Sequence, residues 1–418
     1  MRKTLKITIV STITLLGLLF IYGVGYWISS QMELRSLSKL KIEESPTRHL
    51  SNYIPSTNEI FGWIEDLTKL GRRMPGTEAG TKASEYVAAK FRSFGMENVE
   101  FVEAETVLWT ANEWSLEVGG TLIPSYFMTY SFDTGDFGPF STPATGLKAE
   151  LVYVGKGSDS DFKNIDVKGK IVVAEVHFSE VPVGLARLDS FLYYDPDNTL
   201  PLSSSRINPY SPNTYPYSYY HAMKGGAKAY VGILWNYLDS NRYNNEDYSY
   251  VDGPLKIPGL WVSKNDGKKI IDLVKSKAGS IEASLELSGS RNKVMGRSVE
   301  AFLPGQSEET ILIHSHHDSS TTGAVEDASG TSMVLALARF YSRIPLKDRK
   351  KSLLFTTMDT HFTGYQVHDV FLDKQTSLKR NIIVDICLEH IAKEVQVIDN
   401  KTGKCQRSCR LIGGTTNE

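Results

Sequence analysis

The chain has 418 residues, of which 41% are hydrophobic and 22% are charged, with a formal net charge of −2. This length allows two or three domains of ordinary globular composition, and the charge balance gives no support for nucleic-acid binding. Three cysteines are too few for a disulfide framework, and the sequence has no P-loop, GxGxxG or GxSxG motif.

The N-terminal segment predicts a membrane anchor. Residues 7–32 contain no charged side chain, which exceeds the roughly 20 residues that a membrane helix requires. Basic residues that favour a cytoplasmic N-terminus precede it: Arg2, Lys3 and Lys6. A cleaved signal peptide would have a shorter apolar core and a small-x-small cleavage site. We therefore predict a cytoplasmic tip and transmembrane anchor over residues 1–32, a stalk over 33–56, and the bulk of the chain outside the cytoplasm.

Two helices open the next segment. Apolar residues at helical spacing predict helices at residues 58–70 and 78–94, separated by the turn-forming sequence GRRMPGT at 71–77. An alternating strand at residues 99–103 follows. We assign residues 57–113 to the first part of an α/β domain.

The middle of the chain, residues 114–262, is β-rich and punctuated by Gly, Pro, Tyr and Asn. Strands are expected at residues 150–155, 166–173 and 229–234. No pairing of a nucleophile with a base occurs in this stretch. We expect a compact inserted unit that the chain enters and leaves at neighbouring points. It either positions substrate or is a structural insert with no function of its own.

Residues 263–418 return to the first domain. The expected elements are a helix around 270–274, strands at 284–287, 293–302 and 310–313, a helix at 330–344, and strands at 351–358 and 381–388. This alternation predicts an α/β fold whose mixed sheet is mostly parallel and flanked by helices.

Polar residues gather directly after the strand that begins at Thr310. His316 and Asp318 come first, and Glu326 follows a Ser/Thr/Gly loop. Imidazoles and carboxylates at the carboxyl end of a buried strand are suitable metal ligands, in the usual location of ligand sites in open α/β sheets. In extended chain His316 and Asp318 point the same way, so Asp318 can hold the second imidazole nitrogen. The alternative is a solvated loop that happens to be rich in histidine.

The motif HHD followed by GAVEDASG resembles the HxD and GADDNASG segments of metallopeptidase family 28. These co-catalytic zinc exopeptidases include aminopeptidases and glutamate carboxypeptidases. The GRRMPGT, NKVMG and LPG segments are similar to the same family. In residues 114–262, the order ELVYVG, DVKGKIVV, AMKGGAKAYVGIL and IPGLWVS resembles a protease-associated domain, a module commonly inserted into these peptidases.

The resemblance implies one or two zinc ions that activate a water and polarise a carbonyl. His316 matches the first histidine ligand, and Asp318 matches the residue that holds it. Glu326 stands where the family has its bridging aspartate, and Asp385 matches the second aspartate ligand. We therefore predict His316, Glu326 and Asp385 as metal ligands.

The sequence departs from the family at two places. His361 and Phe362 replace the family's glutamate pair, and Phe362 has no lone pair for zinc. His361 could act as the catalytic base, since its ordinary pKa of about 6.5 suits proton transfer, or it could be a metal ligand. The family's late histidine has no counterpart before Glu418, so we expect a fragment or a frame-altered end.

Two functions follow from these observations. The first is a membrane-anchored, extracytoplasmic zinc exopeptidase, aminopeptidase-like, that acts on peptide substrates. The alternative is a catalytically impaired homologue that binds a peptide or a partner protein. The changes at His361 and Phe362 favour the alternative, and we predict at most one tightly bound zinc and weak or absent aminopeptidase activity. The sequence gives no indication of the oligomeric state.

Overall fold

The structure is a computed structural model that describes residues 17, 22, 24–25, 48–188, 199–244, 253–276, 280–392, 394–399 and 404–408. It divides into two compact units: Met1–Asn52 with Asp189–Tyr193, and Tyr53–Leu188 with Tyr194–Glu418. All but four residues of the predicted anchor, and most of the predicted stalk, lie outside the described residues. None of the helices in the described ranges combines the length and hydropathy needed to cross a membrane.

Two capped helices begin the second unit. They are α2 (Thr57–Lys69) and α3 (Glu78–Ser93), each within a residue of its predicted bounds. The side chains of Ser56 and Thr77 accept a hydrogen bond from a backbone N–H in the first turn of each helix. Each helix buries an apolar stripe: Trp63 and Leu67 in α2, Val87 and Phe91 in α3.

A twelve-stranded mixed sheet organises this unit. At one end, β12 (Thr310–His316) lies parallel to both β13 (Ser352–Met358) and β14 (Ile382–Cys387). β13 also pairs, antiparallel, with β11 (Ile281–Leu303). Every residue of β13 is buried, including the polar Ser352, Thr356 and Thr357, as expected for a central strand covered on both faces.

Helices cover this end of the sheet. α9 (Ser329–Ser342) and α3 contribute to one hydrophobic cluster with β11, β12 and β13, which includes Phe91, Leu335 and Phe355. α10 (Gln366–Ser377) packs through Phe371 in a second cluster with Leu354. No helix was predicted from the sequence at the position of α10.

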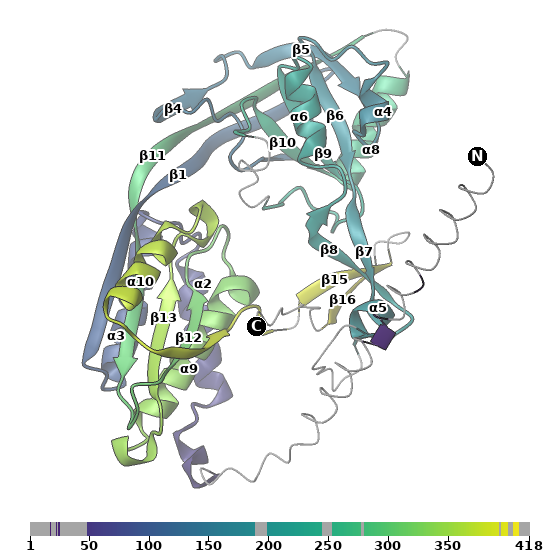
Figure 1. Cartoon of the computed structure of the whole chain (residues 1–418). Helices are drawn as coiled ribbons and strands as arrows, with labels where there is room; N and C mark the ends of the chain where they lie inside the picture. Colours follow the sequence, from purple (N-terminus) through teal and green to yellow (C-terminus); the bar gives the residue numbers. More distant parts are fainter. Residues whose placement is uncertain are drawn as a thin grey trace, which may run out of the picture. The chain divides into compact units, whose positions relative to one another are not determined.

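The longest pairing is the antiparallel ribbon of β1 (Asn98–Val118) and β11, which run side by side in Figure 1. The ladder extends from Asn98 opposite Phe302 to Val118 opposite Ala283, with one irregularity near Ala111. Two separate strands were predicted where β11 is continuous. The polar stretch between them lacks a buried face but keeps its backbone pairing with β1.

The other end of the sheet contains β5 (Leu147–Tyr153), β6 (Ile171–Val176), β9 (Ala229–Leu234) and β10 (Gly259–Ser263), paired in parallel in this order. β5 joins this group to β11 by an antiparallel pairing. The sheet is therefore mixed rather than mostly parallel, because β11 pairs antiparallel with each of its neighbours.

The remaining elements include two separate two-stranded sheets, formed by Phe178–Pro182 with Ser205–Pro212 and by Glu394–Asp399 with Lys404–Ser408. The remaining elements are η1 (Arg48–Tyr53), β2 (Thr121–Leu122), β3 (Ser125–Phe127), β4 (Gly138–Ser141), α4 (Asp159–Phe162), β7 (Phe178–Pro182), α5 (Val183–Leu188), β8 (Ser205–Pro212), α6 (Tyr217–Lys224), α8 (Lys264–Ser276), η2 (Ala324–Ala328), η3 (Leu346–Asp348), η4 (His361–Thr363), β15 (Glu394–Asp399) and β16 (Lys404–Ser408).

Candidate metal centre

Three neighbouring parallel strands deliver side chains to one place. His316 is the last residue of β12, His361 begins the η4 turn after β13, and Glu389 follows β14. Their ligand atoms lie within 4.8 Å of one another. The carboxyl ends of parallel strands meet at one edge of a sheet, so residues far apart in sequence converge there.

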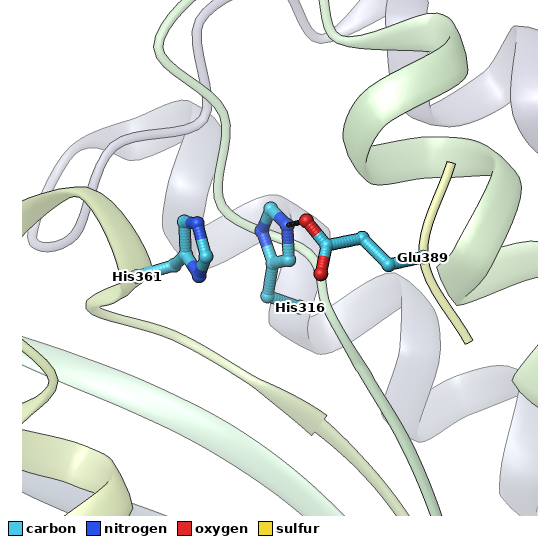
Figure 2. Close-up of side chains that lie close together, drawn as sticks. All are labelled: His316, His361 and Glu389. Carbon is cyan, nitrogen blue, oxygen red and sulfur yellow. Dashed lines mark ion pairs between the residues drawn. The ribbon is translucent and has the colours of Figure 1, made fainter. Parts of the chain in front are cut away.

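His316 lies between the other two side chains (Figure 2). Its ring stacks on the ring of His361, with centroids 4.0 Å apart and planes inclined by 7°. On its other side, Nε2 is 3.6 Å from Oε1 of Glu389. These three residues offer two imidazoles and one carboxylate, a donor set that zinc accepts.

The second nitrogen of His316 is held by Asp318. Nδ1 lies 3.2 Å from Oδ1 of Asp318, whose side chain is fully buried. With its proton on Nδ1, the neutral imidazole presents a lone pair at Nε2. This nitrogen is buried and has no hydrogen-bond partner among the described residues. A buried acceptor without a partner is costly, and a zinc ion bound to Nε2 would satisfy it.

The electrostatics of the centre favour a cation. Burial would lower the pKa of His316, but Asp318 and Glu389 outweigh it and raise that pKa well above its ordinary value. Burial acts in the opposite direction on Glu389, yet His316 and His390 hold the pKa of this carboxyl well below its usual range. The carboxylates of Asp318 and Glu389 therefore place negative charge next to His316, and either a proton or a metal ion can balance it.

His361 is available as a neutral imidazole. Burial, assisted by the nearby His316, lowers its pKa to about 4. The turn that carries it requires unusual backbone angles, with φ of +65° at Thr360 and +109° at Gly364. At neutral pH its ring is neutral and can bind a metal, whereas a pKa of about 4 makes it a weaker proton acceptor than the ordinary imidazole assumed for the base role.

Phe362 belongs to the hydrophobic core. It is 4% exposed and packs with Met74 and Leu108. Its backbone N–H donates to Oδ2 of Asp318 at 3.2 Å, and the hydroxyl of Tyr130 donates to its carbonyl oxygen. Hydrogen bonds to both the backbone N–H and the carbonyl oxygen of Phe362 therefore hold the η4 turn in place.

The structure does not bring the predicted ligand Asp385 to this group. Its side chain is 60% exposed, and Oδ1 lies 3.0 Å from Nε2 of His314. Asp385 is paired with Leu312 in the middle of β14, short of the strand's carboxyl end. Glu389, four residues later, reaches His316 instead. Glu389 could have been predicted from the sequence, because it lies just beyond the end of the strand, where ligands are expected.

The predicted ligand Glu326 is likewise outside the group. It is partly exposed, whereas Asp327 is 1% exposed and places Oδ1 3.5 Å from Nδ1 of His316. The cause is η2, a π-helical turn that contains an extra residue relative to an α-helical turn and changes which side chain faces inward. Burial raises the pKa of Asp327 to about 6, and Arg73 lies 3.9 Å from its other oxygen.

The fold is shared with zinc aminopeptidases. The aminopeptidase from Aneurinibacillus sp. strain AM-1 aligns with a TM-score of 0.52 at 21% identity, over 83% of this chain and 73% of its own. BSAP, a zinc aminopeptidase from Bacillus subtilis, aligns with a TM-score of 0.56 at 20% identity, over 80% and 69%. A peptidase M28 precursor from Shewanella amazonensis SB2B gives 0.59 at 18% identity, over 81% and 72%.

Residues 298–361 match the sequence model of peptidase family M28. This segment includes His316, Asp318 and Asp327 and ends at His361. A comparison with curated proteins finds no match. The segment match and the shared fold confirm the resemblance to the M28 metallopeptidases.

Proposed function

We propose that this protein is a membrane-anchored, extracytoplasmic zinc exopeptidase of the aminopeptidase type. The observation that carries the catalytic part is the buried Nε2 of His316, which has no hydrogen-bond partner in the described part of the chain and faces Glu389. The M28 segment and the fold shared with zinc aminopeptidases support it. The substrate class is a peptide with a free N-terminus.

Each residue of the centre has a distinct part in this proposal. His316, His361 and Glu389 would hold one zinc ion, with Asp318 fixing the tautomer of His316. A zinc ion held by these residues would lower the pKa of a bound water to about 7 and would polarise the scissile carbonyl. If His361 remains unbound, its neutral ring accepts the proton that the attacking water releases and can return it to the leaving amine.

Two further parts of the proposal concern location and positioning. The uncharged segment 7–32 supports an anchor, which extraction of the full-length protein with alkaline carbonate tests directly. If carbonate releases the protein, the anchor is excluded. We also propose that residues 114–262 position the peptide beside the metal centre. The hydrogen bond from Tyr130 to the carbonyl of Phe362 supports this, because it joins that segment to the η4 turn.

The catalytic proposal is tested by zinc content and by release of an N-terminal amino acid. After dialysis we expect at most one zinc per chain, since three grouped ligands suffice for one ion. Slow hydrolysis of aminoacyl p-nitroanilides that disappears with a chelator and returns with zinc supports the proposal. Neither zinc retention nor hydrolysis would refute it. Zinc retention with peptide binding but no hydrolysis would favour an impaired homologue.

A further inference from the structure

Arg72 has an unusual environment for an arginine. The described residues provide no ion-pair or hydrogen-bond partner for its guanidinium, and Nε is buried and unpaired. The adjacent Arg73 differs, because it donates to several backbone carbonyls, including those of His317 and Thr322. Burial lowers the pKa of Arg72, with Tyr126 and Tyr130 opposing that effect. A largely buried charge normally has a partner of opposite charge.

Aromatic rings line the space around this guanidinium. Its Cζ lies 5.8 Å from the ring centroid of Phe127. A second arginine, Arg242, places its own Cζ 5.9 Å from the ring of Tyr126. Cation–π contacts attract a guanidinium but leave its N–H donors without acceptors. An acceptor from outside the chain would complete the site, and Arg72 is partly exposed, so such a group can reach it.

The same residues lie next to the metal centre. Tyr130, which is close to Arg72, donates its hydroxyl hydrogen bond to the carbonyl of Phe362, the residue after His361. On the other side, Arg73 donates to the carbonyl of His317, the residue after His316. Through Tyr130 and Arg73, Arg72 is therefore linked to the residues that directly follow both histidines of the centre.

We propose that Arg72 binds a carboxylate of the peptide substrate and gives the metal centre a preference for peptides with an acidic group near the scissile bond. A guanidinium fork matches a carboxylate with two parallel hydrogen bonds. The carboxylate has two possible sources: an acidic side chain, or the C-terminus of a dipeptide. The inference deepens the proposed peptidase function and rests on it for the identity of the ligand.

Four matched ligands distinguish the two sources. They are hydrolysis-resistant analogues of Ala-Glu, Ala-Gln, Ala-Glu-amide and Ala-Gln-amide, with a methylene in place of the scissile carbonyl. Their binding to the full-length, zinc-loaded protein is measured by titration calorimetry. We expect the analogue with the recognised carboxylate to bind about 10- to 100-fold more tightly than Ala-Gln-amide, the range of a charge-assisted hydrogen bond. Ala-Gln carries only the C-terminal carboxylate, and Ala-Glu-amide carries only the side-chain carboxylate. The one of these two that binds more tightly identifies the carboxylate that is recognised.

Variants of Arg72 complete the test. Arg72→Met should abolish the preference and leave the affinity for Ala-Gln-amide unchanged, whereas Arg72→Lys should keep part of it. Zinc content and the unfolding midpoint check that each variant folds. Equal affinity of the wild type for all four analogues would overturn the inference even if no variant folds. Preserved preference in Arg72→Met would also overturn it. An acidic preference without hydrolysis of any peptide would support Arg72 and refute the catalytic proposal.

Discussion

Asp318 holds Phe362 as well as His316. One carboxylate oxygen lies 3.2 Å from Nδ1 of His316, and the other accepts the backbone N–H of Phe362 at the same distance. A single buried side chain thus joins the end of β12 to the turn that carries His361. The two imidazoles keep their relative positions through this carboxylate.

We expect Asp318→Asn to weaken zinc binding about 10- to 100-fold, as is typical when the partner of a metal-bound histidine is changed. The amide retains one acceptor but has no negative charge to hold the Nδ1 proton of His316. Competition with a chromogenic chelator measures the zinc affinity. The matched control is Asp385→Asn, an exposed aspartate on β14. Equal losses in both variants would contradict a specific role for Asp318.

Glu389→Gln tests the ligand that the structure supplies after β14. Removing its charge should reduce zinc content to well below one ion per chain after dialysis, because a catalytic zinc needs about three protein ligands. The comparison is again Asp385→Asn, which occupies the position predicted from the sequence. Loss of zinc in Asp385→Asn and not in Glu389→Gln would show that the family alignment of this strand is correct.

A second pair of variants tests the π-helical turn. Asp327→Asn removes a buried carboxylate near His316 and Arg73, whereas Glu326→Gln changes a partly exposed neighbour. We expect Asp327→Asn to lower both zinc affinity and the free energy of unfolding, the latter by about 1–3 kcal/mol for a disturbed buried polar contact. Glu326→Gln should change either quantity by less than about 0.5 kcal/mol. Urea unfolding and chelator competition measure both.

The metal-free protein should lose stability as the pH rises above about 6.5. Although burial opposes it, Asp318 and Glu389 raise the pKa of His316, so folding takes up a proton there. A group with a raised folded-state pKa stabilises most below its unfolded pKa, and that contribution is lost as the pH passes the folded value. Burial and Asp318 raise the pKa of Asp359 to about 7, which acts in the same direction.

Urea unfolding between pH 6.5 and 9, with a chelator present, measures this loss. His316→Gln should flatten the curve, because the variant lacks the proton-binding group. Zinc should stabilise the wild type more at pH 8 than at pH 6.5, since it competes with the proton for Nε2. A metal-free wild type that becomes more stable over this pH range would contradict a raised pKa for His316.

Local elements were predictable from the sequence, and long-range pairings were not. Apolar spacing predicted α2 and α3 almost to the residue, and β9 was predicted with its observed bounds. The continuity of β11 depends on β1, nearly 200 residues away, and no local pattern contains that information. Backbone pairing with β1 continues through the stretch between the two predicted strands, so both belong to the single strand β11.

The candidate site likewise combines residues that local sequence predicts with residues whose positions depend on the fold. His316 ends β12 and Asp318 lies two residues further along the chain, so their relationship followed from the period of extended chain. Glu389 and Asp327 depend on where β14 ends and on a π-helical turn, features that counting along a family motif does not reveal. Phe362 stands where the resemblance places a glutamate of the family. Its 4% exposure against Met74 and Leu108 means that a carboxylate there would be buried among apolar side chains.

The ribbon of β1 and β11 also determines how the second unit responds to heat. Trp109 and Leu285 belong to the hydrophobic cluster at one end of the sheet, while Val299 and Leu303 belong to the cluster at the other end. Neither cluster can unfold without breaking part of the pairing between β1 and β11. Calorimetry should therefore record one endotherm for both, and cutting out residues 114–262 would remove the end of the ladder, from Trp114 to Val118, rather than release an independent module.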